Sequence, residues 1–514
     1  MGEFELDKLW SVFLYNPKEP LIFSSGIFLF FFTAFLMIYA VVQKSQRTKI
    51  IFVTAFSLFF YYKSSGIYFL LLVLTTLVDF TIAKLIYRTK NKVDFSIGSS
   101  KIHLSLTDRT VIIWRNLFLI LSLSFNLGVL LYFKYTNFFY EIYTTFSNQK
   151  FEAFDIFLPV GVSFFTFQSL SYTLDVYRKK LTPLDSPMDY AFFVSFFPQL
   201  VAGPIVRASD FIAQMFKPVI VTKEMIGRGV FLICIGLIKK AIIADYISIN
   251  YVDRIFDNPT LYSGFENLVG VYGYALQIYC DFSGYSDMAI GIALLLGYHF
   301  NINFDSPYQS INITEFWRRW HISLSSWLRD YLYISLGGNK KGKIRMYINL
   351  FLTMLLGGLW HGAALRFIIW GALHGIALII HKLFSSIFTF KIEKVFIRKP
   401  LNIISWILTF HFVCFCWIFF RAENMQVVGQ VLNQIAYAFN GKIIFDFING
   451  YPLVLVMMSL GFLFHFAPNS FEISIEKIIV KAPLLFKALI LVLIIILVVQ
   501  FRSAEIQPFI YFQF

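Results

Sequence analysis

The sequence predicts an all-α polytopic membrane protein, and three observations support that prediction. Of the 514 residues, 58% are hydrophobic and only 14% are charged, whereas soluble domains carry about 25% charged residues. The apolar residues are gathered in segments of the length that crosses a bilayer, which takes about 20 residues. The basic residues lie mostly in short loops between these segments. We therefore expect about 11 transmembrane helices, give or take two.

The apolar segments give the expected spans in chain order. They cover residues 22–42, 50–62, 66–86, 111–134, 156–176, 229–246, 268–298, 347–380, 402–420, 452–467 and 484–501. The segment 268–298 can break at Gly284, and 347–380 is long enough for one span or two. The stretch 192–206 contains two prolines and a glycine, so we expect a re-entrant or partly membrane-embedded segment that is sheltered by protein.

The distribution of charge predicts the orientation. The loops 43–49, 88–109 and 178–180 are basic, whereas the segment before the first span carries more acidic than basic residues. The positive-inside rule then places these loops in the cytoplasm and the N-terminus outside it. The first residues lack a basic region followed by an apolar core, so we do not expect a cleavable signal peptide. We expect a polar extracytoplasmic segment at 1–21 and a single integral-membrane domain at 22–514.

Composition also excludes several function classes. The net charge is +14, but the basic residues form no single patch, so we expect no nucleic-acid partner. The four cysteines lie in or beside apolar stretches without metal-ligand spacing, so we predict neither a disulfide framework nor a metal site. The sequence has no GxSxG nucleophile elbow. This favours histidine-assisted direct transfer over a covalent serine or cysteine intermediate.

Three polar residues interrupt the apolar run 277–298. Asp281 and Ser283 lie on different faces of a regular helix, and Asp287 lies about 120° from Asp281. The two carboxylates do not pair unless the helix breaks at Gly284. Two interpretations stay open: the three side chains bond to backbone groups freed by a break, or they line the path of a substrate.

An amphipathic helix is predicted at about 313–329, after Asn312 as the N-cap and with Glu315 at the N3 position. One face carries Trp317, His321, Leu324 and Leu328, and a neighbouring basic face carries Arg318, Ser325 and Arg329. We expect it to lie at the cytoplasmic interface. Arg318 either anchors the helix to lipid phosphates or holds the phosphates of an anionic donor.

The stretch GGLWHGAALRFIIWGALHG at 357–375 holds histidines in an apolar segment. Ionisable groups in hydrocarbon cost several kcal/mol unless they face protein or water. On one continuous helix His374 and His381 share a face and His361 lies opposite them, so we predict no metal cluster and a structural role for the first two. His361 lies between glycines and beside Trp360, where a neutral imidazole can take a proton from a hydroxyl.

These motifs together resemble the membrane-bound O-acyltransferase (MBOAT) family, in its bacterial branch of membrane subunits for alginate O-acetylation. The resemblance rests on PVGVSFFTFQSLSYTLDVYR (159–178), FFPQLVAGPIVR (196–207), QIYCDFSGYSDMAIG (277–291), FWRRWHISLSSWLRDYLYISLGG (316–338), GGLWHGAALRFIIWGALHG (357–375), WIFFRAENM (417–425) and PFIYFQF (508–514). It covers the chain from about residue 25 to the end.

The resemblance implies a ring-like helical bundle with a central funnel or tunnel. It implies His361 of LWHG as the essential histidine and His321 of RRWHIS as the second. Trp317, Arg318 and Trp360, with Asp281, Ser283 and Asp287, are the expected residues of the donor channel. It further implies acetyl-coenzyme A as the acyl donor, with no bound cofactor, and a periplasmic SGNH-hydrolase-like acetyltransferase as partner.

We therefore expect an acetyltransferase of the bacterial inner membrane that acts on hydroxyl groups. It serves O-acetylation of a cell-surface or exported polysaccharide, directly or through the partner. Two alternatives remain. One is D-alanyl transfer to teichoic acid on the same fold. The other is a proton- or ion-coupled transporter in which Asp281, Asp287 and the histidines form the ion path.

Overall fold

The computed structural model describes residues 11–17, 19–89, 92–97, 100–105, 108–201, 203–387, 395–501 and 510. The chain forms two compact units, one up to residue 220 and one from residue 221. The expected single domain at 22–514 stays a prediction. Most of the acidic residues of the expected N-terminal segment and nearly all of the PFIYFQF motif lie outside the described residues.

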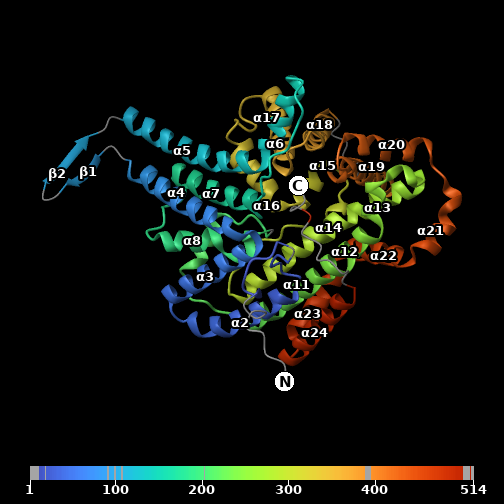
Figure 1. The fold of residues 1–514 in the computed structure, drawn as a ribbon, viewed down its shortest axis with the longest axis horizontal. Helices are drawn as coiled ribbons and strands as arrows, with labels where there is room; N and C mark the ends of the chain where they lie inside the picture. Colours follow the sequence, from blue (N-terminus) through green and yellow to red (C-terminus); the bar gives the residue numbers. More distant parts are fainter. Residues whose placement is uncertain are drawn as a thin grey trace. The chain divides into compact units, whose positions relative to one another are not determined.

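The first unit is helical apart from one β-hairpin. Its helices are α2 (Gly26–Val42), α3 (Gln46–Ser65), α4 (Phe69–Arg88), α5 (Asp108–Leu130), α6 (Thr136–Phe146), α7 (Val162–Tyr177), α8 (Pro187–Ser195), α9 (Phe197–Leu200) and α10 (Ala208–Met215). The strands β1 (Lys92–Ile97) and β2 (Ser100–Ser105) pair antiparallel, with Lys92 opposite Ser105, and join α4 to α5 (Figure 1). The hairpin occupies the predicted basic loop 88–109.

The core of the first unit is aromatic. Phe197 of α9 packs against the rings of Phe35, Phe56 and Phe60, with ring centroids 5.1–5.8 Å apart. The segment 192–206 contributes two short helices and irregular backbone, and the side chains that the structure describes there are buried. This burial fits the predicted sheltered segment, and its depth in the membrane stays a prediction. The expected span 156–176 begins as a helix only at Val162.

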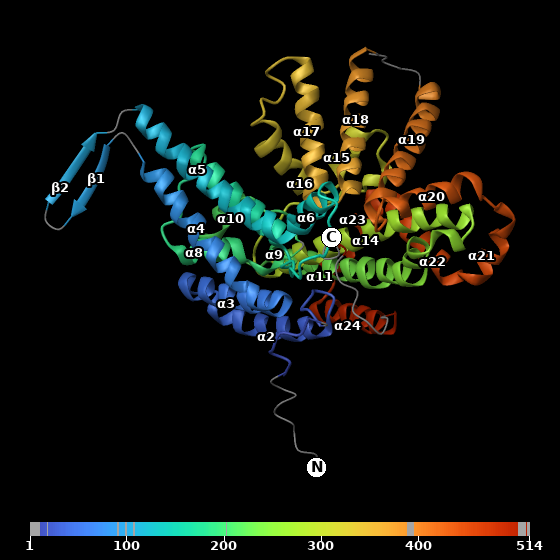
Figure 2. The ribbon, with the colours of Figure 1, turned by 45° about the horizontal axis from the view of Figure 1, so that its top comes forward.

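The second unit contains the helices that carry the predicted site. They are α11 (Lys223–Leu237), α12 (Asp245–Ile247), α13 (Asp253–Asp257), α14 (Gly264–Leu295), α15 (Ile313–Arg319), α16 (Ile322–Trp327), α17 (Lys343–His361), α18 (Leu365–Ile387), α19 (Val395–Arg421), α20 (Met425–Tyr437), α21 (Ile444–Gly450), α22 (Pro452–Phe466), α23 (Asn469–Lys481) and α24 (Leu484–Phe501). A π-helical segment, Ile238–Ala244, continues α11. Figure 2 shows α17, α18 and α19 side by side, in the order in which they contact one another.

The long helix α14 is unbroken, so the possible break at Gly284 does not occur. A Cβ atom at Gly284 would lie 2.7 Å from the carbonyl oxygen of Gly236, and one at Gly291 would lie 2.6 Å from that of Gly229. These glycines therefore let α14 and α11 approach backbone to backbone. The helix is continuous through Gly284. The glycine there allows close helix packing and does not produce a kink.

Among the described residues, five helical stretches are long and apolar enough to cross a membrane, or six if the bent pair α21–α22 is counted as one span. The five are Gln46–Arg88, Asp108–Phe146, Leu365–Ile387, Lys399–Arg421 and Leu484–Phe501. The expected number of eleven is not confirmed. The stretch Leu484–Phe501 coincides with the predicted span 484–501. The segment 347–380 forms two helices, α17 and α18.

Candidate active site

His361 ends α17 inside a ring of aromatic side chains. Its imidazole is 3% exposed. The ring centroids of Trp360 and Trp370 both lie 5.0 Å from it, and that of Phe420 lies 5.2 Å away. Gly362 follows directly, and a Cβ atom there would overlap the ring of Phe367 at 1.9 Å. The glycine after His361 therefore lets the chain turn closely against α18.

The predicted single helix 313–329 is wrong, because the chain breaks at Trp320 and His321. α15 ends at Arg319, and His321 adopts the left-handed conformation with φ 43° and ψ 55° before α16 begins. For a residue other than glycine, the left-handed conformation costs on the order of 1–3 kcal/mol. It persists only where the surrounding structure holds the backbone in place. The predicted face shared by Trp317 and His321 therefore does not exist. The N-cap of α15 is confirmed, since the Glu315 amide donates to Asn312 Oδ1 at 2.8 Å.

Asn303 fixes the tautomer of His321. The backbone N–H of Ser323 donates to Asn303 Oδ1 at 3.2 Å, which identifies that atom as an acceptor. His321 Nδ1 lies 3.2 Å from the same oxygen and must therefore donate. Residues 313–333 lie outside the five membrane-crossing stretches, and burial lowers the pKa of His321 well below its ordinary value. The neutral ring consequently carries its lone pair on Nε2.

Trp360 connects the two histidines that sequence analysis selected. Its ring centroid lies 6.5 Å from that of His321 and 5.0 Å from that of His361. Phe282 of α14 packs edge-on against His321 at 4.6 Å. The structure thus brings both histidines and Trp360 into one buried aromatic neighbourhood.

Trp317 contributes to the same neighbourhood through His374. Its indole N–H donates to His374 Nδ1 at 3.3 Å, so His374 is neutral and holds its proton on Nε2. The ring centroid of Trp370 lies 4.7 Å from that of His374. Because α17 and α18 are separate helices, the geometry of one continuous helix does not apply, and His361 and His374 both pack against Trp370. We call His321, Trp360, His361, Trp370 and His374 the histidine cluster.

The two aspartates of α14 lie in ion pairs. Asp287 bonds to Lys239 at 2.7 Å, and Asp281 bonds to Lys240 at 2.5 Å. Lys240 also bonds to Asp245 at 2.6 Å. Asp281 Oδ2 accepts from the backbone N–H of Ile510 at 3.1 Å. We call Lys239, Lys240, Asp245, Asp281 and Asp287 the lysine–aspartate seam.

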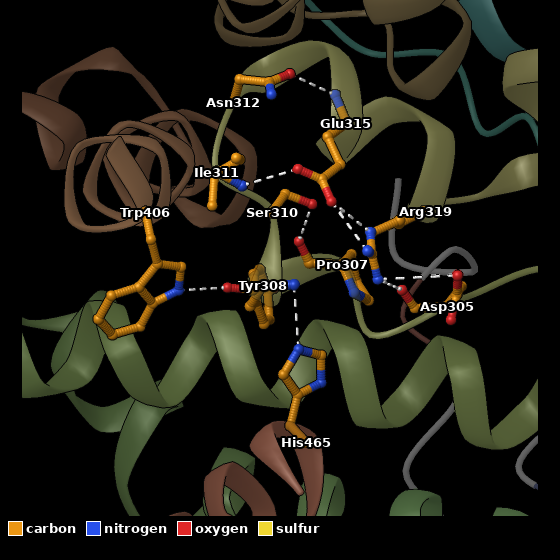
Figure 3. A network of polar contacts seen from close by, with 10 residues as sticks. All are labelled: Asp305, Pro307, Tyr308, Ser310, Ile311, Asn312, Glu315, Arg319, Trp406 and His465. Carbon is orange, nitrogen blue, oxygen red and sulfur yellow. Dashed lines mark hydrogen bonds and ion pairs between the residues drawn. The ribbon is translucent and has the colours of Figure 1, made fainter. Parts of the chain in front are cut away.

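The remaining predicted residues differ in their surroundings. Ser283 is buried, and its hydroxyl has no hydrogen-bond partner among the described residues. Arg318 is exposed. Its neighbour Arg319 is held instead, by an ion pair with Glu315 at 2.9 Å and a bond to the Asp305 carbonyl at 3.2 Å (Figure 3). The expected donor channel of Trp317, Arg318, Trp360, Asp281, Ser283 and Asp287 stays a prediction.

Comparison with known proteins identifies the family. The profile of MBOAT, the membrane-bound O-acyltransferase family, matches residues 182–422. A probable alginate O-acetylase of Pseudomonas putida is 34% identical over 96% of this chain and 100% of its own length. The chain belongs to the membrane-bound O-acyltransferase family. It is accordingly a multi-pass membrane enzyme that transfers acyl groups to hydroxyl groups.

Two further relatives have different names. The peptidoglycan O-acetyltransferase of Helicobacter pylori is 38% identical over 72% of this chain and 74% of its own length. A teichoic acid D-alanyltransferase of Bacillus subtilis is 33% identical over 51% of this chain and 69% of its own length. The matched family region contains both His321 and His361.

Sequence reasoning missed several residues that shape the site. Asn303 lies in the polar stretch before α15, where nothing in the sequence distinguishes its side-chain amide from those of its polar neighbours. Lys239 and Lys240 were visible as the only adjacent cations inside the apolar segment 229–246. Charges buried in apolar surroundings require partners. Two carboxylates on one apolar helix and two lysines on another indicate ion pairs.

Proposed function

We propose that the protein transfers an acetyl group from cytoplasmic acetyl-coenzyme A across the inner membrane, for O-acetylation of a cell-surface or exported polysaccharide. His361, buried among aromatic rings at the end of α17, is the observation on which the proposal mainly rests. The acetylating relatives, named for alginate and peptidoglycan, support a polysaccharide acceptor and cover 96% and 72% of the chain. The N-terminus is extracytoplasmic in this proposal.

The reaction is a direct acyl transfer. His361 accepts the proton of the attacking hydroxyl as its oxygen forms a bond to the thioester carbonyl carbon. The carbon–sulfur bond then breaks, and the proton passes to the leaving thiolate. His321, whose lone pair is on Nε2, orients the acyl carrier or relays the proton. The acceptor is the polysaccharide itself or a serine of a periplasmic SGNH-hydrolase-like partner.

Burial supports this role for the imidazoles. General-base catalysis needs a neutral ring that carries a lone pair, and the hydrogen bond from Nδ1 to Asn303 places that lone pair on Nε2 of His321. Water-poor aromatic surroundings also protect a thioester from hydrolysis. Trp317 and Trp360 form part of the wall on which the acyl group packs in this proposal, and Arg318 contacts the donor phosphates.

Reconstituted protein tests the donor. Vesicles that contain the full-length protein are given acetyl-coenzyme A labelled in the acetyl group, with an acceptor polysaccharide on the opposite side. We expect ester-linked label on the polysaccharide, and a parallel arm supplies purified periplasmic partner. A second arm supplies D-alanyl carrier protein labelled in the D-alanyl group, with teichoic acid as acceptor. Label on teichoic acid in that arm, with no label transferred from acetyl-coenzyme A, contradicts the proposal and favours D-alanyl transfer.

The transporter alternative finds less support. Its ion path needs titratable carboxylates, whereas Asp281 and Asp287 each bond to a lysine. Coupled movement of ions without ester-linked product in the vesicle assay would contradict acyl transfer and favour this alternative.

A further inference from the structure

An apolar cavity of about 310 Å³ lies in the second unit, lined by α11, its π-helical continuation, α14, α22, α23 and α24. None of the predicted site residues lines it. Phe231, Ile235, Phe464, Ile490 and Ile494 supply much of its wall. Ligand pockets span roughly 300–1,000 Å³, so this cavity has the size and the apolar lining of a small ligand pocket.

His465 is one of the side chains that line this cavity, and it carries a buried hydrogen-bond donor. Its Nε2 accepts from the backbone N–H of Tyr308 at 3.1 Å (Figure 3). The neutral ring must then carry its proton on Nδ1. His465 is 4% exposed, and Nδ1 has no partner among the described residues. A buried donor without an acceptor costs about 1–3 kcal/mol, and a ligand carbonyl removes that cost.

The charged groups at the cavity carry one net negative charge when Asp287 is counted. Lys239 and Glu472 both line it, and Lys239 is also bonded to Asp287 at 2.7 Å. The Lys239 ammonium lies 5.6 Å from the centre of the Tyr279 ring, whose centroid lies 4.5 Å from that of His465. An anionic ligand finds no net positive charge here. The ammonium of a zwitterionic ligand matches Glu472, since Lys239 is already paired with Asp287.

The membrane supplies a ligand of this chemistry. α24 is one of the five membrane-crossing stretches. Ile494 of this helix lines the cavity, whereas its neighbour Leu493 is 58% exposed. The wall of the cavity therefore belongs to a helix that is apolar enough to cross a membrane and whose other face is exposed.

We propose that the cavity binds a glycerophospholipid with a zwitterionic ethanolamine head group. One acyl chain fills the space between Phe231 and Ile494. The ester carbonyl accepts the proton of His465 Nδ1, and the ammonium faces Glu472. This lipid is a structural ligand, separate from the acyl group that the enzyme transfers.

Native mass spectrometry of the full-length protein, purified in mild detergent, tests this inference. The probes are phosphatidylethanolamine, phosphatidylglycerol and a free fatty acid, each added at the same concentration. We expect one phosphatidylethanolamine per chain to be retained, in preference to the other two. Retention of only phosphatidylglycerol, of only the fatty acid, or of no lipid overturns the proposal.

Two neighbouring substitutions separate the cavity from the outer surface of α24. Ile494→Trp fills the cavity, whereas Leu493→Trp puts the same side chain on the exposed face. Exclusion of about two buried methylenes corresponds to roughly a tenfold loss of retention. We expect that loss in Ile494→Trp only. Equal retention in the two variants overturns the proposal.

Glu472→Gln tests the head group without touching the core, because Glu472 is exposed. We expect the preference for phosphatidylethanolamine over phosphatidylglycerol to fall several-fold. An unchanged preference overturns the assignment of the ammonium to Glu472, even if Ile494→Trp fails to fold. None of these measurements uses acyl transfer, so the result is independent of the proposed reaction.

Discussion

The histidine cluster and the lysine–aspartate seam both place titratable groups in the interior of the second unit, but they stabilise them differently. The cluster holds its imidazoles between aromatic rings and through two hydrogen bonds: His321 donates to Asn303, and His374 accepts from Trp317. The seam holds full charges, each compensated by an opposite one at 2.5–2.7 Å. A neutral imidazole carries a lone pair that can accept a proton from a ligand, whereas a proton exchanged by a paired lysine or aspartate leaves its buried partner uncompensated.

This difference assigns the proposed reaction to the histidine cluster and a structural role to the lysine–aspartate seam. The seam joins α14 to the segment after α11, in which the π-helical turn Ile238–Ala244 carries Lys239 and Lys240. Each lysine reaches a different aspartate of the same helix. We infer that the seam fixes the position of α14, and that Phe282 of α14 in turn packs against His321.

The largest effect is expected from His361→Ala. General-base assistance contributes roughly 10²–10⁴-fold, so acetyl transfer falls by that factor while the protein still enters the membrane. The measurement is ester-linked acetate on the acceptor, per amount of protein in the membrane. His411→Ala is the matched control, because His411 is exposed on α19, outside the cluster. Wild-type transfer by His361→Ala contradicts the assigned role.

Lys240→Met is expected to have the second largest effect, on stability. Lys240 is 1% exposed in its side chain, and its loss leaves Asp281 and Asp245 without their cation. Breaking a buried ion pair from one side costs about 3–5 kcal/mol. Thermal unfolding in detergent reports the loss. The triple variant Lys240→Met, Asp281→Asn, Asp245→Asn should recover a large part of it, and no recovery would show that packing of the lysine stem, not its charge, matters.

Asn303→Asp is expected to change the pH dependence of transfer. A carboxylate at this position still accepts from His321 Nδ1, but it stabilises the protonated ring and so raises the pKa of His321. The protonated ring has no lone pair on Nε2. Activity is therefore lost at a higher pH than in the wild type as the pH falls.

Asn303→Ala distinguishes positioning from simple support. It removes the acceptor without adding charge, so we expect a lower rate at every pH and no shift of the profile. Rates measured between about pH 5 and pH 9 on both variants decide the matter. If both profiles fall by the same factor without a shift, Asn303 has only a structural role.

The sequence predicts the helical class and the bounds of α24, because long apolar segments determine them locally. It leaves the segment 347–380 open as one span or two, and the structure has two helices, α17 and α18. It does not predict the break at His321, since no glycine or proline marks it and the bonds to Asn303 hold it. It also misplaces the role of Gly284. Gly284 allows close contact with Gly236 of another helix. One sequence does not show which residues from distant parts of the chain come into contact.

The smallest effect is expected from Asp287→Asn, and it sharpens the comparison within the seam. The Lys239–Asp287 pair is more exposed than the Lys240 pairs, with side chains 23% and 20% exposed. Water therefore screens it, and exposed pairs contribute about 0–1 kcal/mol. We expect a loss of stability near or slightly above that range, well below the effect of Lys240→Met, and transfer near the wild-type rate. A loss of transfer as large as that of His361→Ala, at unchanged stability, would contradict this structural role. It would instead assign Asp287 to the reaction and support the predicted place of the α14 carboxylates in the donor channel.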